Sequence, residues 1–206
     1  MKRCIITISR EYGSGGRLVG KALADDLGIP FYDKEIIEIA AEKSGLSPNY
    51  IERNEESAPS SFLYSVAISA YAHPRYTGWT EAPTNDKSFF AQSAAIRQCA
   101  EEGSCVIVGR CADYILRADP DLVRLFFCRK FDERVQFAID NYGLEKEKAA
   151  DRVKRLDRNR ANYYKYYTGK TWGDVHEHDI IINTGYVNVD SAKDVIKAIL
   201  REKGVL

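Results

Sequence analysis

Short apolar segments that alternate with longer amphipathic segments constrain the fold of this chain more than any other sequence feature. The apolar segments are rich in β-branched or aromatic residues, and they lie at residues 3–8, 29–32, 104–108, 122–128 and 179–182. Strands that are apolar almost throughout are typical of parallel sheets covered by helices on both faces. The pattern therefore predicts an α/β fold with a five-stranded parallel sheet.

Segments of helical periodicity separate these strands. Residues 17–27 place leucine, valine and alanine on one helical face, and Gly28 ends that pattern. Asp33 stands where a helix N-cap belongs, and a last helix is expected at about 190–203. Ligands of such folds bind at the carboxyl ends of the strands, so we expect the chemistry there.

The 206 residues fit a single domain, because no linker divides residues 1–206. Residues from about 44 to 90 interrupt the alternation with four prolines and many aromatic residues, which predicts a helical and loop insert after the second strand. The aromatic residues of this insert either stack on a base or build a small helical core. A basic stretch follows at about 145–170.

Composition limits the partners of the chain. Thirty basic and thirty acidic residues give a formal net charge of +0, which argues against a nucleic-acid binder. No apolar run approaches the roughly 20 residues that span a bilayer, so no membrane segment is expected. The five cysteines include no CxxC pair, and the histidines and cysteines show no metal-ligand spacing. These features predict a cytoplasmic protein with reduced thiols; assembly into a homo-oligomer is neither indicated nor excluded.

A glycine-rich loop, Gly13-Ser14-Gly15-Gly16-Arg17, lies between the first strand and the first helix. Glycines let backbone N–H groups approach an anion closely, and the helix N-terminus adds its positive dipole. The loop does not match the ordinary P-loop, GxxxxGK[ST], because Gly16 stands at the lysine position and Arg17 at the Ser/Thr position. The alternative is a tight turn that binds no ligand.

Arginines recur along the basic stretch. Arg152 and Arg155 share a helical face, and Arg158 and Arg160 are expected within reach of the same side. A helix that closes these side chains over phosphates would neutralise charge and exclude water. The alternative is a solvated basic face.

Two acidic residues and one arginine follow strands. Arg110 follows a glycine at a strand end, where a guanidinium group clamps a phosphate or forms a structural salt bridge with Asp113. Asp113 either contacts a nucleotide or caps a short helix at 114–117. The sequence pattern alone explains Asp33 as a plain N-cap.

The segment GSGGRLVGKALADDLGIPFYD resembles the opening of bacterial cytidylate kinases and of cytidylate kinase-like proteins. Four further segments resemble that family in the same order, namely 106–113, 122–134, 157–161 and 179–184. The resemblance implies a three-layer αβα P-loop kinase fold with a helical insert after the second strand and an arginine-rich lid.

The resemblance also implies a function, which is ATP-dependent phosphoryl transfer to CMP, dCMP or a related small acceptor, with Mg²⁺. The implied catalytic residues are Arg17, Arg158 and Arg160. The implied ATP-binding residues are Gly13, Ser14, Gly15, Gly16, Arg17 and Asn183. The implied acceptor-binding residues are Asp33, Arg110, Asp113, Arg152, Arg155 and Asp157. No metal ligand is assigned.

The chain departs from the family pattern at two places. It lacks the lysine and the Ser/Thr of the P-loop, which normally contact the phosphates and Mg²⁺. Cys111 and Ala112 stand between Arg110 and Asp113, where the family pattern has none. These departures keep a second hypothesis open, a degenerate P-loop protein that binds nucleotide or another anion and regulates without kinase turnover.

Overall fold

The computed structural model describes residues 2–55 and 84–206 and contains one parallel sheet of five strands. The strands are β1 (Ile5–Arg10), β2 (Phe31–Tyr32), β3 (Cys105–Val108), β4 (Leu122–Cys128) and β5 (Ile180–Asn183). Their order across the sheet is β2-β3-β1-β4-β5, and every neighbouring pair is parallel. The predicted α/β fold with a five-stranded parallel sheet is confirmed.

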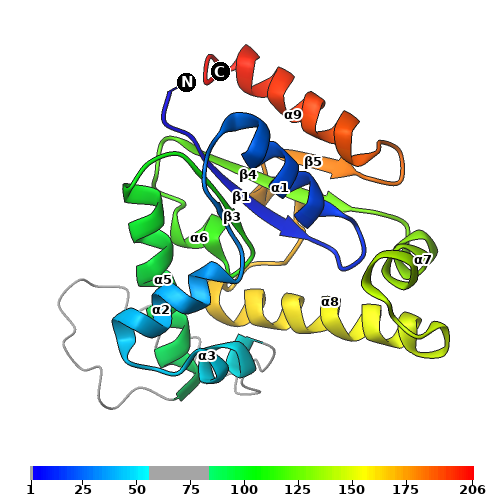
Figure 1. Ribbon diagram of the computed structural model, residues 1–206, viewed down its shortest axis with the longest axis horizontal. Helices are drawn as coiled ribbons and strands as arrows, with labels where there is room; N and C mark the ends of the chain where they lie inside the picture. Colours follow the sequence, from blue (N-terminus) through cyan, green and yellow to red (C-terminus); the bar gives the residue numbers. More distant parts are fainter. Residues whose placement is uncertain (1, 56–83) are drawn as a thin grey trace.

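Helices connect the strands and cover both faces of the sheet (Figure 1). They are α1 (Gly16–Leu27), α2 (Glu35–Ser44), α3 (Pro48–Glu55), α5 (Thr84–Glu101), α6 (Ala112–Ile115), α7 (Phe131–Tyr142), α8 (Lys146–Thr168) and α9 (Val189–Glu202). A short 3-10 helix, Val175–Glu177, precedes β5. None of the helices in these described parts is long and apolar enough to cross a membrane.

The alternation of side chains along β1 divides the core into two layers. Ile6 and Ile8 face α1 and α9, where they pack with buried residues such as Leu23 and Leu200. Ile5 points to the opposite face, which is covered by α2, α5 and α6 together with tyrosines near the end of α8. Figure 1 shows α1 and α9 on one side of the sheet and α2, α5 and α8 on the other. These layers confirm the three-layer αβα arrangement.

The strand β1 extends further toward its carboxyl end than the sequence indicated. The apolar pattern placed the first strand at residues 3–8, but β1 runs from Ile5 to Arg10. Ser9 and Arg10 pair with Phe126 and Phe127 of β4, and these backbone contacts extend the strand beyond its apolar part. The glycine loop therefore begins directly at the end of a paired strand.

The insert is seen in part. Its described portions contain the last residue of α2, all of α3 and the first turns of α5, whereas Tyr64, Tyr71, Tyr76 and Trp79 lie outside the described residues. Phe89 and Phe90 belong to α5, and Phe89 stacks on Tyr167 with ring centroids 3.9 Å apart. For Phe89, the structure therefore favours the core alternative over stacking on a base.

The last helix offers a test of the layer that α9 completes. Leu200 is fully buried, whereas Val195 of the same helix is 45% exposed. Leu200→Ala is expected to lower the free energy of unfolding by about 2–5 kcal/mol, since it leaves a cavity between α9 and the sheet. Val195→Ala should change it by less than about 0.5 kcal/mol. Denaturant unfolding of the two variants checks this, and equal losses would mean that α9 is not packed as described.

Candidate active site

A cleft of about 890 Å³ opens where β1 and β3 end. Its lining joins the glycine loop, the residues after β2 and β3, and one face of α8. The charged residues of the lining are Arg10, Arg17, Lys34, Arg110 and Arg160, together with Glu11, Asp33 and Glu52. Among the residues that the structure describes, five basic against three acidic side chains in the lining favour an anionic ligand.

The glycine loop has the backbone shape of an anion cradle. Gly13 and Gly15 have φ angles of 80° and 77°, in the left-handed region that glycine adopts without strain. Among the described residues, no group accepts a hydrogen bond from the N–H of Gly13 or Gly15. A loop of this kind before the first turn of α1 can bind phosphate oxygens through its backbone.

The lysine position of the loop has no room for a side chain. A Cβ atom at Gly16 would lie 2.7 Å from the Cβ atom of Phe127 in β4. Ser14 is fully buried, its hydroxyl accepts a hydrogen bond from the N–H of Gly16, and its carbonyl accepts one from Thr184. Positions 13 to 16 thus provide backbone groups only, and any cation on the phosphates has to come from Arg17 or from other elements.

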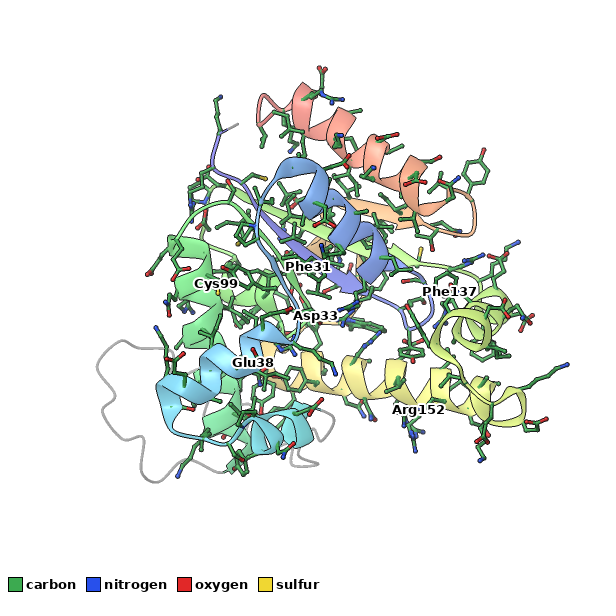
Figure 2. All side chains as sticks on the ribbon, in the orientation of Figure 1. Phe31, Asp33, Glu38, Cys99, Phe137 and Arg152 are labelled. Atoms are coloured by element: carbon green, nitrogen blue, oxygen red, sulfur yellow. The ribbon has the colours of Figure 1, made fainter. Side chains whose placement is uncertain are left out.

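Asp33 follows β2 (Figure 2), lines the cleft and lies close to two guanidinium groups. Arg17 Nε donates a hydrogen bond to its carboxylate, and Arg110 Nη1 lies 3.7 Å from the other carboxylate oxygen. Burial alone would raise the pKa of Asp33, but the hydrogen bond from Arg17 and the nearby positive charges hold that pKa below its ordinary value. The same hydrogen bond raises the pKa of Arg17. Asp33 is not the helix cap that its position suggested, because Lys34 precedes the first residue of α2.

Arg110 enters the cleft from a strained turn. Gly109, Arg110 and Cys111 have φ angles of 76°, 56° and 56°, so two side-chain-bearing residues adopt the left-handed conformation in succession. That conformation costs about 1–2 kcal/mol for each such residue. The guanidinium group is buried and donates to the carbonyl of Val108 at 3.3 Å. Strain of this kind is often found at functional sites.

Arg160 brings a guanidinium group from α8 to the glycine loop. Its Nη1 donates to the carbonyl of Arg10 at 2.9 Å, and its guanidinium carbon lies 5.5 Å from the centre of the Tyr12 ring. Burial lowers the pKa of this guanidinium, although the group stays charged at neutral pH. Leu156, Asn159 and Tyr163 lie on the same side of α8 and also line the cleft.

The other predicted lid arginines lie elsewhere. Arg158 is exposed and is absent from the cleft lining, because a rotation of two residues along a helix turns it away from the side of Arg160. Arg152 and Arg155 line a separate hollow of about 520 Å³ at the turn between α7 and α8. Figure 2 shows Arg152 on α8, apart from Asp33. The expectation that the four arginines share one side is therefore wrong.

Three further predicted residues make contacts within the protein, outside the cleft lining. Asp113 is buried in the first turn of α6 and accepts a hydrogen bond from the Tyr164 hydroxyl at 2.8 Å; burial raises its pKa. Asn183 accepts the N–H of Gly185 at 2.9 Å, which shapes the turn after β5. Asp157 accepts the N–H of Tyr12 at 2.7 Å and forms an ion pair with Arg134. The salt bridge suggested between Arg110 and Asp113 is not formed, since Arg110 turns toward Asp33.

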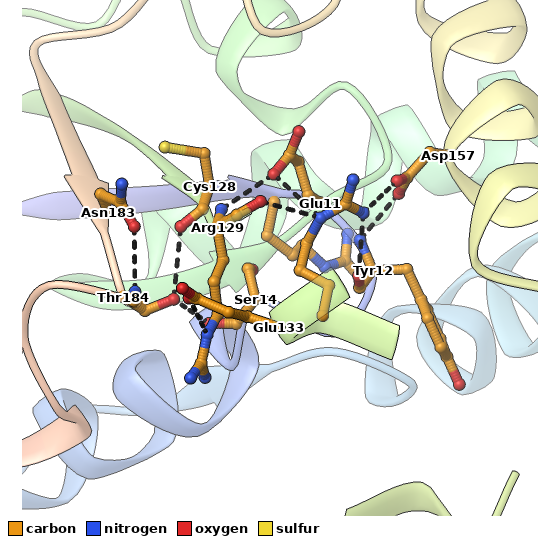
Figure 3. A network of polar contacts seen from close by, with 12 residues as sticks. Glu11, Tyr12, Ser14, Cys128, Arg129, Glu133, Asp157, Asn183 and Thr184 are labelled. Atoms are coloured by element: carbon orange, nitrogen blue, oxygen red, sulfur yellow. Dashed lines mark hydrogen bonds and ion pairs between the residues drawn. The ribbon is translucent and has the colours of Figure 1, made fainter. Parts of the chain in front are cut away.

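Two residues that hold the loop in place are not predicted by the sequence pattern, namely Glu11 and Arg134. Glu11 accepts a hydrogen bond from the N–H of Arg129 at 2.9 Å, and Arg134 Nη1 donates to the carbonyl of Tyr12 at 3.1 Å (Figure 3). Arg134 Nε also donates to the carbonyl of Arg129 at 3.0 Å. Glu11 stands beside the loop in the sequence, but nothing there indicates its partner, which lies 118 positions away.

The donor atoms of the cleft suit a metal ion that arrives with a nucleotide. Within residues 2–55 and 84–206, no three His, Cys, Asp or Glu side chains gather as a metal site. Mg²⁺ that enters with a nucleotide usually keeps phosphate and water ligands and needs only one or two carboxylates. Asp33 fits that donor set, whereas the buried hydroxyl of Ser14 does not.

Comparisons with known proteins agree with this geometry. The model of the cytidylate kinase-like family matches residues 5–186. A solved structure of an uncharacterized protein from Eubacterium ventriosum is 30% identical, with a TM-score of 0.71 over 98% of this chain and 99% of that one. No curated protein sequence matches the chain.

Two shikimate kinases share the fold at low identity. The enzyme from Bacteroides thetaiotaomicron is 15% identical with a TM-score of 0.55, over 97% of this chain and 99% of that one. The enzyme from Acinetobacter baumannii, solved in complex with shikimate, is 13% identical with a TM-score of 0.52, over 98% of this chain and 96% of that one. These structural similarities confirm the P-loop kinase fold but give no information on the substrate of this chain.

Two substitutions at position 110 measure the strain of the turn after β3. Both Arg110→Gly and Arg110→Ala remove the guanidinium group, but only glycine adopts the left-handed conformation freely. The glycine variant is therefore expected to be more stable than the alanine variant by about 1 kcal/mol in denaturant unfolding. An alanine variant that is equally or more stable would show that this turn is not strained.

Proposed function

The chain belongs to the cytidylate kinase-like family, and on that premise we propose that it transfers the γ-phosphoryl group of ATP to a small anionic acceptor such as CMP or dCMP. In this reaction the bond from the γ-phosphorus to its bridging oxygen breaks, ADP leaves, and an acceptor oxygen takes the phosphoryl group. Such a transfer depends on positioning and charge neutralisation more than on covalent participation of the protein.

One observation carries this proposal. Guanidinium groups from three different elements, those of Arg17, Arg110 and Arg160, line the same cleft as the backbone of the glycine loop. Stabilisation of the fold alone would not require several guanidinium groups around the buried carboxylate of Asp33. The arrangement suits two phosphate-bearing ligands that meet over the loop.

The residues divide the work by their place in the cleft. The N–H groups of Gly13 and Gly15, together with Arg160, hold the phosphates of the donor. Arg17 stands at the first turn of α1 beside Asp33, where it contacts the transferred group. Arg110, at the end of β3, holds the anionic part of the acceptor. When bound, Mg²⁺ neutralises charge on the donor phosphates, and Asp33 is the carboxylate that fits it.

The acceptor end of the cleft is lined by Asn49 and Glu52 of α3 and by Tyr163 and Trp172. These side chains can stack on a ring and form hydrogen bonds with its edge. Asp113, which resembles the family's acceptor-binding aspartate, lies outside this lining. Acceptor choice therefore depends on residues of α3 and α8, and we include acceptors other than CMP in the test.

The crowded lysine position favours a second candidate function. Since no side chain fits at Gly16, the loop lacks the cation that ordinary P-loops place on the phosphates. A protein that binds nucleotide in this cleft and regulates a partner without turnover is the alternative.

A turnover assay separates the two functions. ADP formation from ATP and Mg²⁺ is measured with a panel of acceptors that includes nucleoside monophosphates and shikimate, the ligand of one structural neighbour. Turnover with CMP or dCMP, lowered at least tenfold by Arg110→Ala, is the expected result. No turnover across the panel, with ATP still raising the melting temperature, would favour the regulatory candidate.

Two arginines of α8 provide a matched pair. Arg160→Ala is expected to lower kcat by about 10²-fold or more, because it removes a charge from the phosphate site. Arg158→Ala, two residues away, should leave kcat and KM within about twofold, because this side chain is exposed and lies outside the cleft lining. Steady-state kinetics with the best acceptor checks both. Equal losses of kcat in the two variants would mean that Arg160 does not differ from Arg158 in its contact with the phosphate site.

A further inference from the structure

We propose that Asp157 is a positioning residue, which fastens α8 to the segment just before the glycine loop and thereby holds Arg160 as the cation that replaces the P-loop lysine. This inference rests on the proposed function, because it assumes that the loop binds the phosphates of ATP. It gives Asp157 a role through Arg160, in place of the acceptor contact that the family resemblance implied.

The replacement follows from the crowding at the loop. Position 16 cannot carry a cation, since its Cβ atom would overlap Phe127. Arg17 is the next cation along the chain, but its Nε is bonded to Asp33 and the side chain is half exposed. The guanidinium group of Arg160 contacts the segment just before the loop, at the carbonyl of Arg10 and the ring of Tyr12.

Asp157 connects the same helix to the same segment. One carboxylate oxygen accepts the N–H of Tyr12 at 2.7 Å, and the other forms an ion pair with the buried Arg134 (Figure 3). Arg134 in turn donates to the carbonyl of Tyr12 and lies 3.3 Å from Glu11. Both backbone groups of Tyr12 are therefore bonded, one by α8 and one by α7.

The spacing along α8 makes this connection relevant to Arg160. Residues three apart lie side by side on a helix, so Asp157 and Arg160 belong to neighbouring positions on the side that faces the loop. Asp157 bonds the N–H of Tyr12 while Arg160 packs over its ring and bonds the preceding strand end. Loss of the carboxylate removes the bond that fixes this part of α8 against the loop.

The charge of Asp157 also argues against contact with a ligand phosphate. A free carboxylate would repel a phosphate, but both oxygens of Asp157 are engaged by protein donors, and the residue is absent from the cleft lining. A satisfied carboxylate that neutralises Arg134 keeps that guanidinium group from competing for the anion. The geometry thus suits a positioning role.

ATP affinity measured calorimetrically in a double-mutant cycle tests the proposal. Asp157→Ala is expected to raise the Kd for ATP about tenfold, within the range of coupling energies for residues that share a network. Asp157→Asn keeps an oxygen for Tyr12 and should fall between the wild type and Asp157→Ala. Asp151→Ala removes an exposed carboxylate from the same helix and serves as the matched control, with a Kd within about twofold of the wild type.

The decisive comparison is made in the Arg160→Ala background. If Asp157 acts through Arg160, Asp157→Ala added to Arg160→Ala will weaken ATP binding no further. A full tenfold loss in that background would overturn the positioning role while leaving the proposed function intact. Wild-type protein that fails to bind ATP would overturn the proposed function, and the positioning role with it. If Asp157→Ala does not fold, Asp157→Asn takes its place in the cycle, with the same criterion of additivity.

Discussion

The close packing of the glycine loop against its neighbours is the constraint on which the site depends. A Cβ atom at Gly13 would lie 2.4 Å from the carbonyl oxygen of Arg134, and one at Gly16 would overlap Phe127. These contacts fix the loop by packing against α7 and β4. They also exclude side chains from positions 13 and 16, so the positive charge in the cleft comes from Arg17 at the start of α1, from residues after β2 and β3 and from α8.

Several elements bring positively charged side chains into the cleft, and the carboxylate of Asp33 compensates part of this charge. Guanidinium groups that converge in one cleft repel each other, and water screens them less as they become buried. A carboxylate between Arg17 and Arg110 offsets that repulsion and orients both side chains. Its lowered pKa follows from the same contacts and keeps it ionised at neutral pH, so the arrangement is stable without a bound anion.

The sequence predicts the architecture well and the site only in part. Strand order along the chain, the helices between them and the glycine loop follow from apolar runs and turn residues, which act locally. The distinction between Arg158 and Arg160 needs the rotational setting of α8, which is fixed by buried tertiary contacts of Tyr164 and Tyr167. The contact of Asp157 with Tyr12 joins residues 145 positions apart, and no local pattern encodes such a pairing. The family motif predicts an acceptor contact for Asp113. Because Cys111 and Ala112 separate it from Arg110, Asp113 lies within α6 instead.

The overlap between position 16 and Phe127 also limits how this loop can change by mutation. Restoring lysine in a single step would force its Cβ into the ring of a fully buried residue of a central strand. An ordinary P-loop therefore becomes accessible only if β4 is altered at the same time, which makes each change harmful alone. Single substitutions that improve phosphate binding are therefore expected in the surrounding elements, such as α8, and not at position 16 of the loop.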